Sequence, residues 1–276
     1  MFASFMVNAW IVASIVAIVA GIVGFFVVVR GAAFAAHSLP MGAFSGAAAA
    51  ALLGVDRFYG LVVFSGLGVF AISQLGRRAR HEVATALSLV ALLGTGTLFL
   101  SMTSAYSQAV YSLLFGEVLG IGRGEILPVA IAAALSIVVI AIFFRPLLLS
   151  SLSAELGEVR GVRSRRMELW FLSVLALATA MALPVVGALL VFSLMIAPPA
   201  IARSLTDRPG VAILYSAAIA LLTVWTAIAA SYVTDWPVGF FVGTLGAVFY
   251  GAERCVSALR ASSGRNGAGR PAASPT

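Results

Sequence analysis

Lysine is absent from this sequence, in which all 17 basic residues are arginine. A P-loop needs a lysine to reach the phosphates of a bound nucleotide. The absence therefore excludes a lysine-bearing P-loop ATPase, so any ATP that drives this protein must be bound by another subunit. Cysteine is nearly absent as well. The one cysteine, Cys255, excludes a disulfide within the chain.

Charged side chains are also scarce. They make up 10% of the 276 residues, whereas a soluble domain carries about 25%, and 62% of the residues are hydrophobic. The apolar runs are long and uninterrupted, which favours membrane-spanning helices over the alternating strands of a barrel. The net charge of +7 does not indicate nucleic-acid binding, because the arginines lie beside the apolar runs. This composition predicts an all-α, polytopic protein of the lipid bilayer.

Sequence motifs for enzyme chemistry are missing too. We find no pattern of a serine or cysteine triad, no HExxH motif, no CxxC pair and no glycine-rich nucleotide fingerprint. Enzyme chemistry therefore has no support in this sequence, and we expect no ATPase site and no bound cofactor in this chain.

Nine apolar runs have the length of a membrane-spanning helix, which needs about 20 residues. A further segment, residues 105–121, is apolar but interrupted by glycine and glutamate, and we predict a re-entrant or surface helix there. The tail, residues 258–276, is rich in Gly, Ser, Pro and Ala and is predicted to be disordered. Residues 1–257 then form one transmembrane domain. The nine runs are residues 9–29, 33–53, 58–75, 84–103, 126–144, 169–185, 187–203, 211–231 and 238–253.

The arginines predict how the chain is oriented, because cytoplasmic loops carry an excess of basic residues. If the N-terminus lies outside, every arginine except Arg57 and Arg123 falls on the cytoplasmic side. We therefore predict a multi-pass protein of the cell membrane (plasma or inner) whose C-terminus is cytoplasmic. The loop at residues 150–168, between the fifth and sixth runs, is then cytoplasmic too.

This cytoplasmic loop reads SSLSAELGEVRGVRSRRME. Leu152, Leu156 and Val159 have the spacing of one helix face. Ser153 can cap the start of such a helix, and Gly161 can end it. Two interpretations are open, an ordinary solvated loop and a docking helix for a soluble partner. The second predicts partner contacts at Leu152, Glu155, Leu156, Val159, Arg160 and Gly161.

One ionisable residue, His37, lies clearly within a predicted span. Met41 follows four positions later and so shares its helix face. Neutral imidazole is a common ligand for zinc and other transition metals, and a thioether is a softer one. An ionisable side chain at membrane depth indicates a functional site. The alternative is a histidine bonded to a neighbouring helix, with Met41 as packing.

Prolines mark candidate helix breaks at Pro40, close to His37, and at Pro198 and Pro199. Breaks of this kind free backbone carbonyls for ions or allow rocking in transporters. They also occur as packing features, and both interpretations stay open at this point.

Five stretches carry a family resemblance, and they occur in one order along nearly the whole chain. The longest are VVVRGAAFAAHSLPMGAFSGAAAAALLG at Val27–Gly54 and VVGALLVFSLMIAPPAIARSLTDR at Val185–Arg208; the others are Tyr111–Ile121, Ser153–Val162 and Asp235–Tyr250. Together they resemble the permease family of ABC importers for zinc, manganese and iron.

The resemblance implies a helical permease that forms a homodimer, with cytoplasmic ATP-binding cassette ATPase subunits below it and an extracytoplasmic metal-binding protein above. ATP would be bound by the partner, and Ser153–Val162 matches the place of the family's cytoplasmic coupling helix. The family usually has an acidic residue and, four positions later, a histidine that contact the metal in transit. His37 stands at the acidic position and Met41 at the histidine position, so this pair contains no carboxylate.

We therefore predict the permease subunit of an ATP-driven importer that moves a divalent transition metal ion, zinc or manganese, into the cell by alternating access. One alternative keeps this architecture and changes the cargo to a metal chelate or another small solute. Another is an ATP-independent channel or secondary transporter, which is disfavoured because coupled transporters carry acidic relays within the membrane. A scaffold that does not transport is a further alternative.

Overall fold

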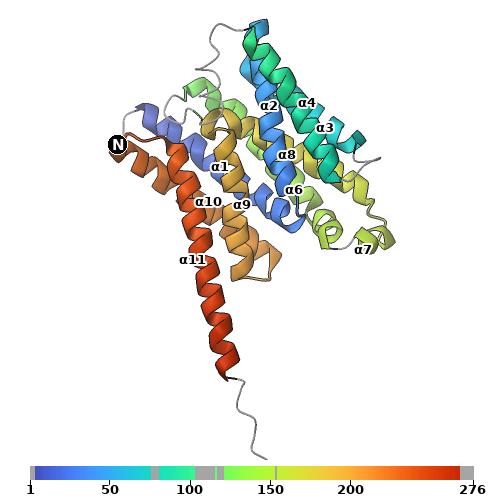
Figure 1. Cartoon of the computed structure of the whole chain (residues 1–276), viewed down its shortest axis with the longest axis vertical. Helices are drawn as coiled ribbons and strands as arrows, with labels where there is room; N and C mark the ends of the chain where they lie inside the picture. Colours follow the sequence, from blue (N-terminus) through green and yellow to red (C-terminus); the bar gives the residue numbers. More distant parts are fainter. Residues whose placement is uncertain (1–3, 76–80, 103–115, 117–120, 153, 268–276) are drawn as a thin grey trace, which may run out of the picture.

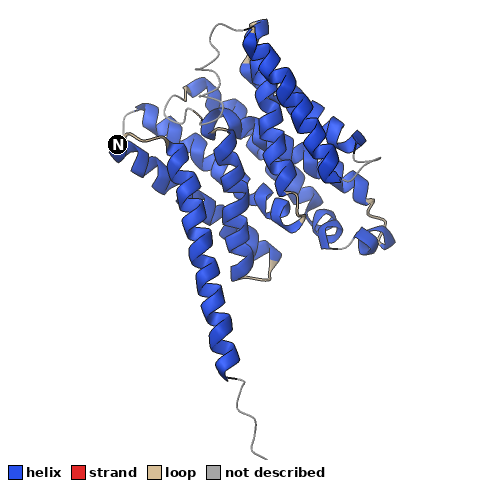
Figure 2. Cartoon of the chain, viewed as in Figure 1, coloured by secondary structure: helices blue, strands red, loops and turns tan. Residues whose placement is uncertain are grey.

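The computed structural model describes residues 4–75, 81–102, 116, 121–152 and 154–267. Within those ranges every regular element is an α-helix, as predicted (Figures 1 and 2). The helices are α1 (Ser4–Val29), α2 (Ala33–Leu53), α3 (Arg57–Leu75), α4 (His81–Ser101), α6 (Arg123–Leu152), α7 (Ala154–Val159), α8 (Ser164–Val186), α9 (Ala188–Leu205), α10 (Pro209–Thr234) and α11 (Val238–Gly267).

Each of the nine predicted runs coincides with one long helix. Among the described residues, six helices are long and apolar enough to cross a membrane, namely α1, α3, α4, α6, α8 and α10. The prediction of a multi-pass helical protein is therefore confirmed, while the count of nine spans stays a prediction. The segment at 105–121, predicted to be re-entrant, lies outside the described residues except at Gly116 and Ile121.

Two helices extend further than their apolar runs. α6 continues past Pro146 to Leu152, so Leu152 ends this helix and α7 begins only at Ala154. The backbone of α11 is helical to Gly267, although disorder was predicted from residue 258 onward. Extending an existing helix avoids the cost of nucleation, and the alanine, leucine and arginine that follow residue 257 are strong helix formers.

The predicted breaks do not interrupt their helices. α2 is helical through Pro40, and α9 is helical through Pro198 and Pro199. A proline inside a helix removes one backbone donor, but the hydrogen bonds on either side can continue the helix when neighbouring helices pack around it. All three prolines are buried.

α1 lies at the centre of the larger part of the bundle and packs against α6, α8, α9 and α10. Two glycines let its neighbours come close, because a Cβ atom at Gly21 would lie 2.6 Å from the Cα atom of Ala217, and one at Gly24 would lie 2.9 Å from the Cα atom of Met195. The Ser216 hydroxyl donates a 2.7 Å hydrogen bond to the carbonyl oxygen of Gly21. The fully buried face of α1 includes Val12, Val16, Ala17, Val23 and Phe26.

A second group of helices, α2, α3 and α4, packs beside this core and meets it through α8 and α9. The backbones of α2 and α3 touch where Gly46 faces Gly60, and a Cβ atom at either position would overlap the other's carbonyl oxygen. The hydroxyl of Ser45 donates a hydrogen bond to the carbonyl oxygen of Leu92 in α4. These contacts fix α2, and with it His37, against two helices.

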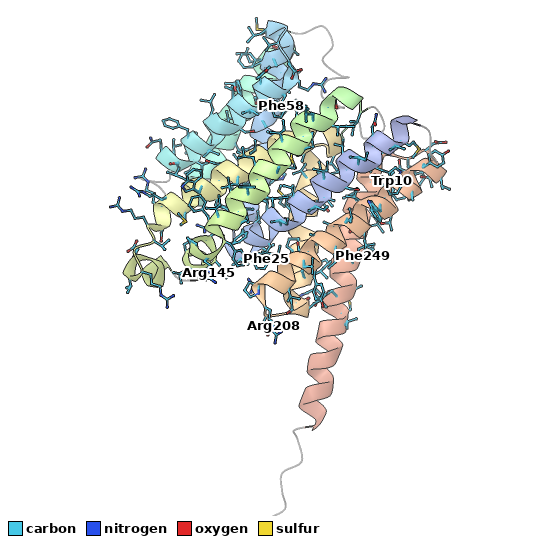
Figure 3. The ribbon with its side chains drawn as sticks, turned by 180° about the vertical axis from the view of Figure 1, so that it is seen from behind. Trp10, Phe25, Phe58, Arg145, Arg208 and Phe249 are labelled. Atoms are coloured by element: carbon cyan, nitrogen blue, oxygen red, sulfur yellow. The ribbon has the colours of Figure 1, made fainter. Side chains whose placement is uncertain are left out.

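The two ends of the bundle differ in side-chain chemistry. Figure 3 shows Arg145 and Arg208 at the end that carries α7, whereas Trp10 and Phe58 lie toward the opposite end. We call the first of these the α7 end. Figure 1 shows that α11 projects beyond the other helices on the same side.

Candidate functional site

His37 lies in the first half of α2, on the side that faces α9. Its ring packs edge-on against Phe192 of α9, with 5.0 Å between the ring centroids and an angle of 70° between the planes. The side chain is half-buried. The sequence predicted the position of His37 within a helix, but it carried no signal for this aromatic neighbour.

The Nδ1 atom of His37 is buried and has no hydrogen-bond partner within the described part of the chain. Leaving a buried polar atom unsatisfied costs about 1–3 kcal/mol. An imidazole nitrogen is also a common ligand of transition-metal ions. The environment of this nitrogen therefore fits a side chain that contacts a ligand or an ion for part of its working cycle.

Met41 lies one turn after His37 in the same continuous helix. It is half-buried and packs against an apolar cluster that includes Leu183 of α8 and Ala188 of α9. The same cluster contains Leu61 of α3 and Leu100 of α4, so Met41 lies where α2 meets several helices, whereas the described ring contact of His37 is with α9. The surroundings of Met41 alone are those of a packing residue.

Among the residues that the structure describes, no group of three or more His, Cys, Asp or Glu side chains could hold a metal ion. Within those residues, the hypothesis of a metal contact concerns His37 and Met41.

The predicted docking segment contains the short helix α7, and its end is well defined. Gly161 adopts φ +77°, a left-handed conformation that favours glycine. The amides of Gly161 and Val162 donate to the carbonyl oxygens of Glu158 and Gly157 at 2.9 Å each. This is the Schellman pattern, so Gly161 ends the helix as predicted.

The outer surface of α7 is open to contact. Val159 is 86% exposed, and Glu158, Arg160 and Gly161 are exposed as well. The side chains of Leu152, Glu155 and Leu156, and the whole of Ser153, lie outside the described residues.

Arg30, in the turn between α1 and α2, is a residue whose contacts sequence reasoning missed. Its guanidinium donates hydrogen bonds to Ser150 and Ser151 at the end of α6. The pKa of this guanidinium is lowered overall, because burial disfavours the charged form. The nearby carboxylate of Glu168 favours the charged form and offsets part of that shift. The contacts join residues more than a hundred positions apart, which no local pattern reveals.

Comparison with known proteins identifies the family. The model of the ABC 3 transport family matches residues 2–253. The chain belongs to the ABC 3 transport family.

Relatives within the ABC 3 transport family resemble most of the chain. The manganese transport system membrane protein MntC of Listeria innocua is 29% identical over 206 residues, which cover 74% of this chain and 73% of the relative. The high-affinity zinc uptake system membrane protein ZnuB of Buchnera aphidicola is 22% identical over 231 residues, which cover 83% and 88%. PsaBC from Streptococcus pneumoniae, solved in complex with Fab, shares the fold with a TM-score of 0.82 at 24% identity, over 91% of both chains.

Proposed function

We propose that this chain is the permease subunit of an ATP-driven importer for a divalent transition metal ion, zinc or manganese. The observation that carries the proposal is the family match, which extends over residues 2–253. The names of the relatives refer to manganese and zinc systems. Imidazole and thioether groups, which the chain presents at His37 and Met41, are ligands for metals of this class.

The ATP is hydrolysed by a separate subunit, because this chain has no lysine with which to build a P-loop. That subunit docks at the α7 end, which we expect to be cytoplasmic from the arginine distribution. α7 supplies the contact surface, with Val159 and Arg160 exposed on it and with Leu152, Glu155, Leu156 and Gly161 as further contacts.

The ion passes between α2 and the pair α8 and α9 as the bundle alternates its access between the two sides of the membrane. His37 Nδ1 is the first ligand on this path, and the sulfur of Met41 is the second, one turn away. Two neutral ligands hold an ion weakly, which suits a path because the ion must leave as well as enter. A metal-binding protein delivers the ion at the opposite end, and two copies of the chain form the permease.

Expression of the chain with its neighbouring genes tests the proposal. We expect an ATP-binding cassette subunit to co-purify with the permease, and we expect zinc or manganese content of metal-starved cells to rise when both are present. Metal accumulation that requires an added chelator would instead support import of a metal chelate. A permease that purifies without an ATPase and leaves cellular metal unchanged would contradict the importer.

A further inference from the structure

Arg30 connects three helices at the α7 end. Its Nη1 atom donates hydrogen bonds to the hydroxyl oxygens of Ser150 at 2.9 Å and Ser151 at 3.2 Å, both in the last turn of α6. The same atom lies 3.5 Å from the carbonyl oxygen of Leu147, to which both serine hydroxyls also donate. On α8, the centre of the guanidinium lies 5.1 Å from the ring centroid of Phe171, within cation–π range.

The environment of Arg30 sets it apart from the other arginines. Arg30 is half-buried, whereas every other arginine whose side chain the structure describes is exposed. A cation withdrawn from water needs hydrogen-bond acceptors around it, and removing them leaves a charge without compensation. The serine hydroxyls and the Phe171 ring therefore hold the Arg30 side chain in place more firmly than water holds the exposed arginines.

Arg30 lies between a pocket and buried apolar side chains, among them Leu147 and Phe171. Arg30 borders a cavity of about 250 Å³, which is also lined by Phe34, Thr85, Glu168 and Phe171. Because side chains do not fill this pocket, the polar contacts of Arg30 act together with the apolar packing to hold the turn against α6 and α8.

The contacts of Arg30 bracket α7. Ser150 and Ser151 lie directly before α7 in the chain, and Glu168 and Phe171 lie in the first turns of the helix that follows it. α7 itself packs mainly against α6 and α8. The position of α7 is therefore set by two helix ends, and Arg30 touches both. In the other direction the chain continues from Arg30 into α2, which carries His37.

We propose that Arg30 is a positioning residue that ties the α6–α7–α8 segment to the α1–α2 turn, so that movement of α7 is transmitted to α2 and His37. The transmission part of this proposal rests on the proposed function, in which an ATPase subunit docks on α7. The mechanical part, that Arg30 fixes the place of α7, concerns this chain alone.

The mechanical part is tested with spin-label distances in the full-length protein in nanodiscs. Labels are placed at Val159→Cys on α7 and Leu214→Cys on α10, both exposed positions, in a Cys255→Ser background. We expect a narrow distance distribution for the parent and a clearly broader one for Arg30→Gln. The double variant Ser150→Ala, Ser151→Ala keeps Arg30 but removes its two hydroxyl acceptors, and it should broaden the distance distribution as well. Arg208→Gln, an exposed arginine at the same end, is the matched control and should leave it narrow.

The transmission part is tested by the ratio of metal transported to ATP hydrolysed, with permease and ATPase reconstituted together. For Arg30→Gln we expect about a tenfold lower ratio, equivalent to about 1.4 kcal/mol, with the ATPase still bound and hydrolysing. Arg30→Lys keeps the charge and one donor and should restore part of the ratio, although it lacks the planar fork. Combining Arg30→Gln with the two serine substitutions should lower the ratio of transport to hydrolysis little further than Arg30→Gln alone.

Both results together support the proposal. Distances that do not change in Arg30→Gln or in the serine variant overturn it, and so does a broadened distribution with an unchanged ratio of transport to hydrolysis. A parent protein that neither binds an ATPase nor transports metal would contradict the proposed function instead. In that case the spin-label distances still decide by themselves whether Arg30 positions α7.

Discussion

At the residue scale, the Nδ1 atom of His37 is buried and has no hydrogen-bond partner among the residues that the structure describes. His37 was singled out from sequence because it is ionisable and lies at membrane depth, and its contact with a metal ion stays a prediction. Phe192 and the contacts of Arg30 could not be predicted in the same way. They join residues far apart in the chain, and only the packing of the helices brings them together.

The first prediction concerns this pair. His37→Ala removes the proposed nitrogen ligand, so we expect growth that depends on scarce zinc or manganese to be lost, with normal amounts of protein in the membrane. Met41→Ala removes the proposed softer ligand and should change which metal is preferred. Growth curves on metal-limited medium with each metal added back measure both effects.

His81→Ala is the matched control, because His81 is the other histidine in the chain. The double variant His37→Asp, Met41→His installs the family's usual residues. It should broaden the range of transported metal ions to include manganese, since carboxylate oxygen suits that harder ion. Parental growth of His37→Ala on every metal would show that the pair only packs.

At the scale of helices, the sequence located the elements better than their ends. The nine apolar runs match nine long helices, because burial in a membrane requires long apolar segments. The apolar run at 126–144 ends before α6 does, because the helix continues through Pro146 to Leu152. The end of α7 was placed correctly, because Gly161 acts through its own backbone conformation.

The second prediction concerns the contact between α2 and α3. Gly46→Ala places a methyl group against the carbonyl oxygen of Gly60, so the helices must separate. We expect a loss of about 1–3 kcal/mol in stability, the usual cost of overpacking. Gly66→Ala in α3 is the matched control, because nothing lies within 4 Å of the added Cβ atom. Thermal unfolding in detergent compares the two, and equal midpoints would contradict this close contact.

The third prediction concerns α7. Val159 is 86% exposed in the isolated chain, so Val159→Asp should leave its thermal stability unchanged. In the complex the added carboxylate would be buried against the ATPase without a partner, and such a group is costly at an interface. We expect weaker ATPase binding and loss of metal-stimulated hydrolysis.

Leu205→Asp is the control for this variant, because it adds the same charge at another exposed position near the end of α9. Pull-down of the ATPase and hydrolysis assays compare the two variants. Equal ATPase binding by Val159→Asp and the parent would mean that α7 is only a connection.

At the scale of the whole molecule, the segregation of arginine to the α7 end predicts the topology. In a Cys255→Ser background, Val159→Cys at the α7 end should react with an impermeant thiol reagent only after the cells are opened. Tyr59→Cys, exposed near the opposite end, should react in intact cells. Labelling of Val159→Cys in intact cells would reverse the orientation and remove the cytoplasmic docking site.

The fold class and the transport family could be anticipated at this scale, because composition and ordered motifs extend over the whole chain. The arrangement of two helix groups, one around α1 and one around α2, could not, because it depends on contacts between helices far apart in the chain, such as α1 with α10 and α2 with α8.

ATP-dependent metal accumulation in sealed proteoliposomes tests the central claim most directly. The permease and its ATPase are reconstituted together, with radiolabelled zinc or manganese on the side away from the ATPase. We predict accumulation of at least one of these free ions, which stops when ATP or the ATPase is omitted and when His37→Ala replaces the parent. Accumulation that continues without ATP or the ATPase, or hydrolysis that moves neither ion, would contradict the claim.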